Sequence, residues 1–522
     1  MKVLQSVHAP GVVRRVSVAT IVVVGAVWLV IRFIGLNTAP HGAWLDETWD
    51  AVQVMCLAEN GHDADGQFWP LISNGQGGGS LPITWTAPMV AWTHVFGTSL
   101  AGFRSLSAVW VALSCAGLFA IARALIRLVP TSKLPGSSGV DAFPWLVGFA
   151  GLVSPWSFQF SRISWEQPVA PFFLVIAVFA MVRLAAQGSV LWALLCGVCG
   201  ACSMITYPPL RVAVPCILAL GGVILLLSKV RGSARRKFAG GLVLSALTLV
   251  AAFAPVVFRL ASGQDRKRML YVSIFAPDWL NGHRGDMSRE RFFVLTFLDN
   301  LWMHLRPSYL LGTGDPNLRH STHLVGQLSP IDILAVGLAV AGGGWIALLA
   351  YRQMSGRTAS DWPRLDERER VLVMAALSSM VAGMFATFPA ALTWEGLPHA
   401  LRSIGAWPFV ALFSGAVLAI GWTRLRWLPA VTAGLALVYT GYFLPGYFRV
   451  YGRVDSGVFF RDLSEAVDAA KQKQPPRSVL RALRPFARRY GPEVLRYYLM
   501  HDGGLGCEES LKAYEQLRGR PQ

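Results

Sequence analysis

Long apolar stretches recur along this chain, and they constrain its fold more than any other feature of the sequence. Eleven of them reach roughly 18 to 20 residues, the length at which a helix crosses the hydrocarbon core of a bilayer. They occupy about residues 17–36, 104–128, 143–160, 168–186, 189–207, 211–228, 238–259, 331–351, 371–390, 402–421 and 428–446. The stretches do not alternate apolar with polar residues, so membrane-spanning strands are not expected. The sequence therefore predicts an all-α polytopic membrane protein with about 11 transmembrane helices.

The composition of the chain supports a membrane location. Of its 522 residues, 54% are hydrophobic and only 15% are charged, and the mean hydropathy is +0.46. A soluble chain would carry about 25% charged residues. The net charge of +18 comes from Lys and Arg that gather in short loops between apolar stretches, as the positive-inside rule requires. Membrane lipids are therefore the expected surroundings, and no nucleic-acid partner is expected.

The topology depends on a twelfth apolar stretch, 82–97, which is short and contains Pro82, Pro88 and His94. If this stretch is re-entrant or juxtamembrane and does not cross, five basic loops all fall on the cytoplasmic side. Those loops hold Arg123, Arg127 and Lys133; Arg183; Lys229 to Lys237; Arg352 to Arg370; and Arg424 with Arg426. The first helix is then uncleaved, with its N-terminus in the cytoplasm.

This topology divides the chain into a transmembrane domain over residues 1–446 and a small non-cytoplasmic C-terminal soluble segment over residues 447–522. Two large outer loops, 37–103 and 261–330, interrupt the first part. We expect the outer loops to form the active site. Cys56 and Cys507 both fall in outer segments and could pair, although nothing in the sequence requires it. Cys196, Cys199 and Cys202 lie inside an apolar stretch, where packing between helices explains them better than a metal site.

Polar residues that are unusual for their position collect on the outer side. Asp46 and Glu47 open the first outer loop directly after the first helix, and adjacent carboxylates suit a general base or a cation ligand. The alternative is an ordinary solvated loop start. The segment from Gly312 to His323 has the Gly, Pro and Asn content of a structured turn. Arg319 and His320 within it offer charge and donors to an anion, although an ordinary loop is equally compatible with the pattern.

Arginines also stand at the outer ends of several predicted helices, namely Arg104, Arg162, Arg211 and Arg402. Each could simply extend its side chain to the interface. The positive-inside rule nevertheless predicts few arginines on this side, so their number calls for a local cause. The planar guanidinium group binds phosphate well, and a lipid phosphate at the outer interface would supply that cause.

In their order along the chain, these residues resemble the motifs of a known family over about residues 17–446. The sequence resembles the C-type membrane glycosyltransferases that use polyprenyl-phosphate sugars, especially the protein O-mannosyltransferases and the aminoarabinose transferases of lipid A. The motifs that carry the resemblance are Asp46-Glu47; Gly61 to Gly66; Pro82 and Pro88; Phe96-Gly97 and Arg104; Ser161-Arg162 with Glu166-Gln167-Pro168; Tyr207 to Arg211; Gly314 to His320; and Pro398 to Arg402. The chain departs from many relatives at Thr48-Trp49-Asp50, where they have an arginine, and at Gly79 to Pro82, where the aminoarabinose branch has a lysine.

The resemblance implies an inverting membrane glycosyltransferase that moves a sugar from a polyprenyl-phosphate donor to an acceptor on the outer face of the membrane. The acceptor is unknown, and the family implies a bacterial plasma membrane. Asp46 would be the general base, and Glu47 would support it. No nucleotide site is needed, no cofactor is assigned, and a divalent cation at Asp46 and Glu47 stays open. The donor phosphate would be bound by Arg104, Arg319, His320 and Arg402, with Arg162 and Arg211 as weaker candidates. Glu166, Tyr207, Asp315 and His399 complete the set of candidate site residues.

The alternative is a polytopic transporter or lipid flippase, in which charged groups also lie within the membrane.

Overall fold

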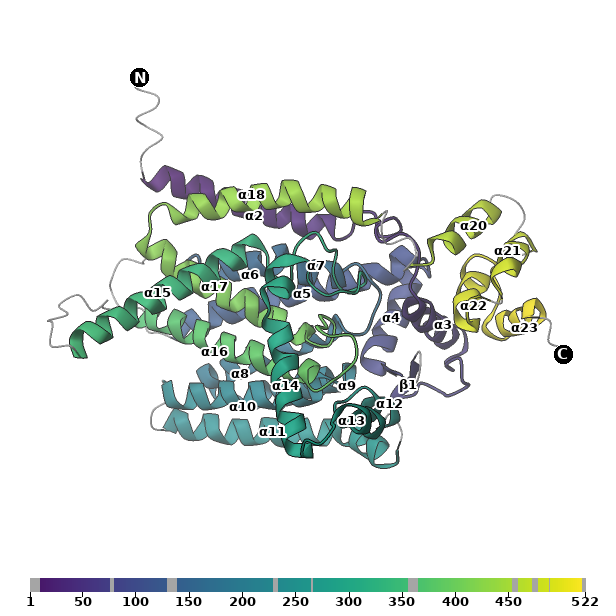
Figure 1. Cartoon of the computed structure of the whole chain (residues 1–522), viewed down its shortest axis with the longest axis horizontal. Helices are drawn as coiled ribbons and strands as arrows, with labels where there is room; N and C mark the ends of the chain where they lie inside the picture. The colour runs from purple at the N-terminus through teal and green to yellow at the C-terminus, as the bar shows by residue number, and fades with distance from the viewer. Residues whose placement is uncertain are drawn as a thin grey trace, which may run out of the picture.

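The structure is a computed structural model that describes residues 10–75, 79–128, 139–228, 233–263, 266–354, 365–452, 459–471, 477–487 and 489–518. The described residues are mostly helical, and their strands form one short two-stranded sheet. Long helices lie side by side in a bundle, as Figure 1 shows. The all-α polytopic fold predicted from the sequence is confirmed. Of the residues discussed above, 76–78, 129–138, 229–232, 355–364 and 472–476 lie outside the described ranges.

Eight helices in the described part of the chain are long and apolar enough to cross a membrane. They are α5 (Leu100–Arg127), α8 (Val169–Gln187), α10 (Leu210–Ser228), α11 (Ser233–Ala261), α15 (Pro330–Met354), α16 (Glu367–Ala391), α17 (Trp407–Arg424) and α18 (Leu428–Gly446). In the other predicted spans lie α2 (Pro10–Ile31), of which Arg15–Ile31 counts as a shorter apolar helix, and the shorter apolar helices α6 (Phe143–Val153) and α9 (Val190–Thr206). The count of eleven transmembrane helices stays a prediction.

The twelfth apolar stretch forms helix α4 (Ile83–Phe96), which has 14 residues. At 1.5 Å per residue, this helix is about 21 Å long, shorter than the ~30 Å of a bilayer core. Pro82 precedes α4, and Gly97 ends it with φ of 73°. This short length agrees with the re-entrant or juxtamembrane alternative, which stays a prediction.

Several helix ends follow from local sequence signals. The Ser99 hydroxyl accepts a hydrogen bond from the Gly102 N–H at the start of α5, and the Asp366 carboxylate accepts one from the Glu369 N–H at the start of α16. Such caps satisfy backbone donors that lack a partner within the helix. Gly188 ends α8 in the left-handed conformation that glycine adopts most readily.

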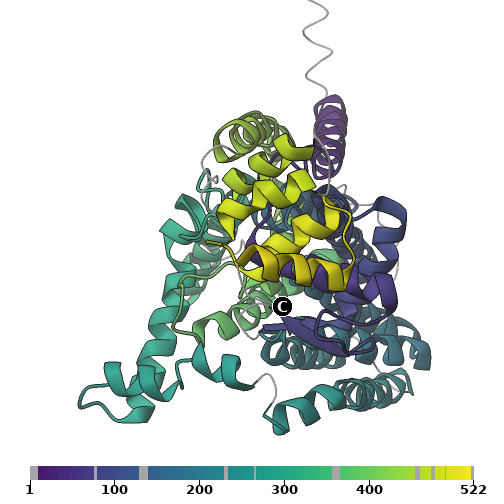
Figure 2. The same ribbon diagram turned by 90° about the vertical axis from the view of Figure 1, so that its right-hand side faces the viewer.

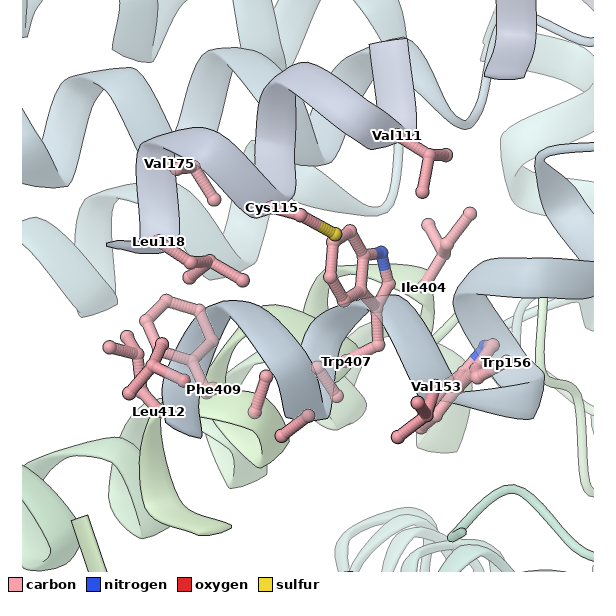
Figure 3. Close-up of a cluster of buried hydrophobic side chains, with 14 of the residues drawn as sticks. Val111, Cys115, Leu118, Val153, Trp156, Val175, Ile404, Trp407, Phe409 and Leu412 are labelled. Carbon is pink, nitrogen blue, oxygen red and sulfur yellow. The ribbon is translucent and has the colours of Figure 1, made fainter. Parts of the chain in front are cut away.

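Helix α17 lies at the centre of the bundle, because 72% of the residues in its apolar stretch are buried. In α15, at the periphery, the buried share is 17%. The first turns of α17 pack against α5 and α6, and Figure 3 shows the resulting cluster around Trp407. Gly415 of α17 lies against Val147 of α6, where a Cβ atom would be 2.4 Å from the valine Cγ2 and 2.8 Å from its Cα. Small residues thus allow the two backbones to approach closely, as is common between helices in membranes.

Shorter elements cover the end of the bundle that the topology places outside. They are α3 (Leu45–Asn60), β1 (Ile72–Gly75), β2 (Gly79–Pro82), α7 (Pro155–Phe160), α12 (Arg266–Tyr271), α13 (Pro277–His283), α14 (Arg289–Leu305), the π-helix η2 (Ser308–Gly312) and the 3-10 helix η3 (Ile404–Ala406). The strands pair antiparallel, with Ile72 opposite Pro82.

The C-terminal segment continues from α18 through the π-helix η4 (Tyr447–Tyr451). It then forms α20 (Arg461–Lys471), α21 (Arg477–Leu483), η6 (Arg484–Phe486), α22 (Pro492–His501) and α23 (Cys507–Arg518). These helices gather at one end of the bundle beside α3 (Figures 1 and 2). Their apolar residues, such as Leu463 and Leu495, share one buried cluster with Val52 of α3. The C-terminal segment therefore packs directly on the first outer loop.

The contact between α17 and α6 predicts an asymmetric response to adding a methyl group. Gly415→Ala should lower the free energy of unfolding by about 1–3 kcal/mol, because the new Cβ would press on the backbone of Val147. Gly434→Ala on α18 is the matched control, since no heavy atom lies within 4 Å of its added Cβ. Unfolding of both purified variants in mixed micelles by SDS titration measures the difference. Equal stability of the two variants would contradict the close approach.

Candidate active site

The first turn of α3 carries Asp46 and Glu47 in different environments. Glu47 is 2% exposed. One of its carboxylate oxygens accepts the Trp44 N–H at 3.0 Å, and the other accepts the Ser164 N–H at 2.8 Å. Negative side chains are favoured at a helix N-terminus, where backbone N–H groups lack partners. Glu47 thereby ties the start of α3 to the loop that follows α7.

Arg104 of α5 forms a buried ion pair with Glu47. Its Nε and Nη2 donate to the two carboxylate oxygens of Glu47, each at 2.8 Å. The other guanidinium hydrogens go to the carbonyl oxygens of Leu36, Pro40 and Gly42, each at 2.7 Å. All five N–H groups of Arg104 are therefore used inside the protein, and its side chain is fully buried. Arg104 therefore has no free N–H group with which to bind a phosphate, the role that the sequence predicted for it.

Asp46 is half-buried and forms no ion pair with another described residue. Burial raises the pKa of its carboxyl group above the ordinary value, and the charges of Arg319 and Arg268 oppose that rise. Arg319 comes from the second outer loop, and its guanidinium carbon lies 4.0 Å from the centre of the Trp44 ring, a cation–π contact. Its Nε donates to Asn317 Oδ1 at 3.1 Å. The structure thus brings the two large outer loops together at Asp46.

Two further acids lie close enough to influence Asp46. Asp50 follows it by one helical turn, on the same face of α3, and is 4% exposed. The Oδ2 atom of Asp50 is buried without a hydrogen-bond partner among the described residues. Burial raises the pKa of Asp50 well above the ordinary value, and the negative charge of Glu166 raises it further. Burial raises the pKa of Glu166 to about 8, and its Oε1 accepts a hydrogen bond from Gln167 at 2.6 Å.

Asp50 and Arg268 are site residues that the sequence analysis did not select. The spacing of four residues after Asp46 was the available signal for Asp50. Arg268 is an exposed side chain on α12, and its positive charge lowers the pKa of Asp46. It belongs to a basic run on the predicted outer side, the same departure from the positive-inside rule that drew attention to the other arginines.

Arg162 is another arginine whose guanidinium group forms hydrogen bonds within the protein. It is fully buried, and its guanidinium group donates to the carbonyl oxygens of Ile31, Arg32, Ile34, Gly35 and Ala39. Carbonyl groups at a helix C-terminus lack partners within the helix, so a cation there is stabilising. Arg162 therefore fixes the end of α2. Arg211, at the start of α10, donates to the Met204 carbonyl at 3.3 Å and lies near the Phe253 ring.

Asp315 orders the loop between η2 and α15. It is 1% exposed, and its Oδ1 accepts the Asn317 N–H at 2.8 Å. Its Oδ2 accepts the Ala400 N–H at 2.7 Å and contacts His320 Nδ1 at 2.9 Å. A carboxylate can only accept, so the His320 Nδ1 carries the proton and Nε2 keeps its lone pair. Burial lowers the pKa of His320, which disfavours the imidazolium form that phosphate binding would need.

His399 and Arg402 reach the same region from the segment before α17. The His399 ring stacks on His320 with centroids 4.6 Å apart. Arg402 donates to the Thr393 hydroxyl at 2.9 Å and pairs with Glu395 at 3.3 Å. Burial lowers the pKa of His399, and the positive charges of His320 and Arg402 lower it further.

Asp315, His320 and His399 form the group of side chains, among the described residues, that could hold a metal ion. Their potential ligand atoms lie within 4.8 Å of one another. A carboxylate that orients a histidine in this way is common around metal ions. The sequence left open a divalent cation bound by Asp46 and Glu47. In the structure, both carboxylate oxygens of Glu47 already accept hydrogen bonds from N–H groups.

Tyr207 is buried between α9 and α10. Burial raises its pKa, while the nearby Arg402 favours the charged form. The charge of Arg402 acts on the pKa values of Tyr207, His320 and His399, and the stacking of His320 on His399 brings the second outer loop against the segment before α17. Apart from Arg211, which contacts Met204 and Phe253, the predicted candidates divide into two groups. Asp46, Glu166, Tyr207, Asp315, Arg319, His320, His399 and Arg402 meet at the outer end of the bundle, whereas Glu47, Arg104 and Arg162 hold its backbone in place.

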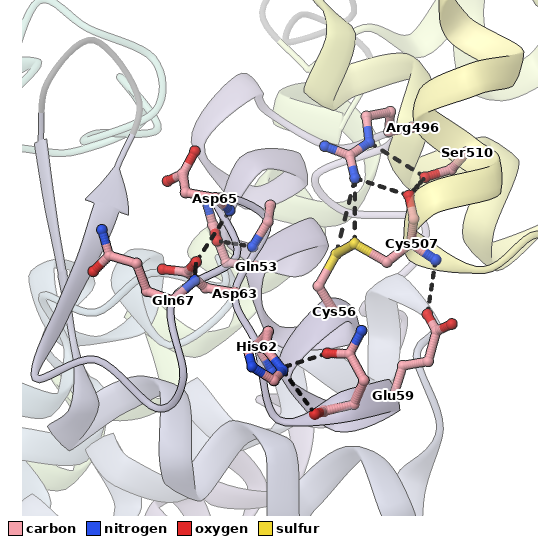
Figure 4. Close-up of a disulfide and its surroundings, with 12 residues drawn as sticks. Gln53, Cys56, Glu59, His62, Asp63, Asp65, Gln67, Arg496, Cys507 and Ser510 are labelled. Atoms are coloured by element: carbon pink, nitrogen blue, oxygen red, sulfur yellow. Dashed lines mark hydrogen bonds between the residues drawn. A yellow bond between two sulfur atoms is a disulfide. The ribbon is translucent and has the colours of Figure 1, made fainter.

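A disulfide bond anchors the other end of α3. Cys56 and Cys507 are joined across a sequence separation of 451 residues, as Figure 4 shows. The buried Arg496 lies beside the bond and donates to the Cys507 carbonyl at 3.0 Å, and Glu59 accepts the Cys507 N–H at 2.7 Å. The helix that presents Asp46 is thus fixed by an ion pair at its start and by a covalent bond near its end.

No protein-family model and no curated protein sequence match this chain. Among solved structures, it is similar to the oligosaccharyltransferase of Archaeoglobus fulgidus, with 12% identity and a TM-score of 0.47 over 92% of this chain and 59% of that one. It is also similar to ArnT from Cupriavidus metallidurans bound to undecaprenyl phosphate, with 15% identity and a TM-score of 0.43 over 96% of this chain and 78% of that one. Both are C-type glycosyltransferases, the class that the motifs resemble.

The ion pair between Glu47 and Arg104 predicts that the effect of replacing one residue on the free energy of unfolding depends strongly on the other. Arg104→Met should lower the free energy of unfolding by about 3–5 kcal/mol, because it leaves the buried Glu47 carboxylate without its counter-ion. The double variant Glu47→Gln, Arg104→Met should regain part of that loss, and SDS titration measures both. If the double variant is as unstable as Arg104→Met alone, the carbonyl bonds of Arg104 and not the ion pair account for the stability.

Proposed function

We propose that this protein is an inverting membrane glycosyltransferase that transfers a sugar from a polyprenyl-phosphate donor to an acceptor hydroxyl. The proposal places the reaction at the end of the bundle where Asp46 lies, on the non-cytoplasmic side. Three features support it: an available carboxylate, arginines beside it, and a membrane-embedded fold. The motifs from Asp46 to Arg402 resemble those of such enzymes in the same order along the chain.

The environment of Asp46 is the observation that carries the proposal. Its neighbour Glu47 is saturated with N–H donors, whereas Asp46 is half-buried and has no ion-pair partner among the described residues. A general base needs a lone pair that an incoming hydroxyl can reach, and a pKa raised toward the working pH makes it more effective. Asp46 meets both conditions, and the burial that raises its pKa gives the physical reason.

The reaction is a single displacement. The Asp46 carboxylate takes the proton of the acceptor hydroxyl as its oxygen forms a bond to the anomeric carbon. The bond between that carbon and the phosphate oxygen breaks at the same time, and the polyprenyl phosphate leaves with the electron pair. Attack from the face opposite the leaving group inverts the anomeric configuration, as in inverting reactions at sugar carbons in general.

The leaving phosphate gains negative charge during the reaction, so positive groups near it lower the barrier. Arg319 is the best placed of the predicted phosphate ligands, because it adjoins Asp46 and its Nη groups make no hydrogen bond within the described part of the chain. Arg402 acts on the same region. Arg104 and Arg162 are assigned here as positioning residues, since their guanidinium groups are bonded within the protein.

Replacing the base tests the proposal directly. Asp46→Asn keeps the shape of the side chain but cannot accept the proton, so turnover should fall by about 10²- to 10⁴-fold. The measurement is the release of free polyprenyl phosphate from a panel of polyprenyl-phosphate sugars by purified protein. Asp278→Asn on α13 is the matched control, because its exposed side chain lies outside the site. It should keep normal turnover.

Two outcomes would count against this assignment. Near-normal transfer by folded Asp46→Asn protein would remove Asp46 as the base, and Glu166 would be the next carboxylate to replace. No release of polyprenyl phosphate by the unmodified protein, together with movement of the intact lipid across the membrane of proteoliposomes, would instead support the transporter or flippase alternative.

The raised pKa values also predict the dependence of turnover on pH. The acidic limb should lie above the usual range of an aspartate, because burial raises the pKa of Asp46 and only its ionised form accepts a proton. Glu166, with a pKa of about 8, is neutral below that pH and negative above it. Turnover should therefore fall above about pH 8, as the new charge repels the donor phosphate. Glu166→Gln should remove this alkaline fall, and an unchanged profile would contradict the assignment.

A further inference from the structure

A large cavity lies in the membrane-spanning bundle, toward the end opposite the active site. Its volume is about 870 Å³, which falls in the usual range of ligand pockets, roughly 300–1,000 Å³. Helices α5, α8, α10, α11, α16 and α17 line it, with side chains such as Leu125, Met181, Leu220 and Met374. Along α16 the lining runs from Glu367 to Ala382, which is about 22 Å at 1.5 Å per residue.

Charged side chains stand at one end of this cavity. Arg127 is in the last turn of α5 and Arg370 is in the first turn of α16, and both are exposed. Glu367 is the acidic residue of the lining, so the lining of that end, with two arginines and one glutamate, carries one net positive charge. The positive-inside rule places these helix ends in the cytoplasmic leaflet. The cavity is thus apolar along its length and basic where it reaches the headgroup level.

We propose that this cavity binds an anionic glycerophospholipid of the cytoplasmic leaflet, with its phosphate at Arg127 and Arg370 and an acyl chain along α16. The inference is independent of the proposed glycosyl transfer. Acyl chains surround a spanning bundle, and the exposed lining side chain of Met374 opens the cavity to them. Basic pockets between transmembrane helices on the cytoplasmic side are typical sites for anionic headgroups. The length of the cavity exceeds the ~15 Å of hydrocarbon in one leaflet, so a whole chain fits along it.

Native mass spectrometry of the full-length protein, stripped of lipid and then supplied with defined lipids, tests the proposal. Phosphatidylglycerol should remain bound where zwitterionic phosphatidylethanolamine dissociates. The double variant Arg127→Gln, Arg370→Gln should retain about tenfold less phosphatidylglycerol, since each basic residue near a headgroup contributes to binding. Added phosphatidylglycerol should also raise the Tm of the unmodified protein but not that of the double variant.

The matched control is the double variant Arg123→Gln, Arg426→Gln, which removes the same charge at the same end of the bundle. Both residues are exposed and neither lines the cavity, so retention should match that of the unmodified protein. Equal losses in the two double variants would overturn the proposal, because they would show attraction by net charge alone. Retention of phosphatidylethanolamine as strong as that of phosphatidylglycerol would overturn it as well.

A third variant tests whether the lipid enters the cavity. Ser378→Phe narrows the lining, and the lost hydroxyl bonds only backbone carbonyls within α16, those of Met374 and Ala375. It should lower retention without altering the charges at the end of the cavity. Unchanged retention would place the lipid on the surface and contradict the cavity site. Displacement of phosphatidylglycerol by a polyprenyl phosphate added at lower concentration would assign the cavity to an isoprenoid tail and also overturn the proposal.

Discussion

The buried ion pair between Glu47 and Arg104 is the interaction on which the outer face depends. A buried charge pair is stable only when the remaining donors and acceptors are also satisfied, and here they are. Arg104 binds three carbonyl groups of the segment between α2 and α3, and Glu47 binds the backbone N–H groups of Trp44 and Ser164. The pair thus joins α5, α3 and the loop after α7 at one point. Asp46 is the residue next to that point, so its position follows from the pair.

The same arrangement explains why adjacent carboxylates have different roles. Glu47 faces inward to a guanidinium group that neutralises it, whereas Asp46 faces the second outer loop and meets Arg319. Burial raises the pKa of Asp46, and the acids Asp50 and Glu166 lie within reach of its charge. Several carboxyl groups in one partly buried space cannot all be ionised near neutral pH. The site can therefore hold a proton and an accepting carboxylate together, which suits proton transfer from an acceptor hydroxyl.

Much of the fold could be predicted from the sequence, because apolar length and loop charge depend on the bilayer and not on tertiary contacts. The pairing of Cys56 with Cys507 stayed open, since only the docking of the C-terminal helices on α3 brings the two together. Sequence also led to Arg104 as a phosphate ligand. An arginine at an outer helix end looks the same in sequence whether it meets a ligand or, as here, five acceptors within the protein. Asp50 and Arg268 each had a local sequence signal, but the neighbours that give them their relevance, Glu166 for Asp50 and Asp46 for Arg268, lie on distant segments.

The stereochemistry of transfer tests the central claim, that Asp46 acts as a base and not as a nucleophile. Purified protein would be given a polyprenyl-phosphate sugar of known anomeric configuration, labelled in the sugar, with a cell-envelope extract as the source of acceptor. Nuclear magnetic resonance of the labelled product reports its configuration. The account predicts a product of inverted configuration, formed together with one free polyprenyl phosphate for each sugar transferred. A product of retained configuration would contradict it, because a single displacement from the face opposite the leaving group inverts the anomeric carbon.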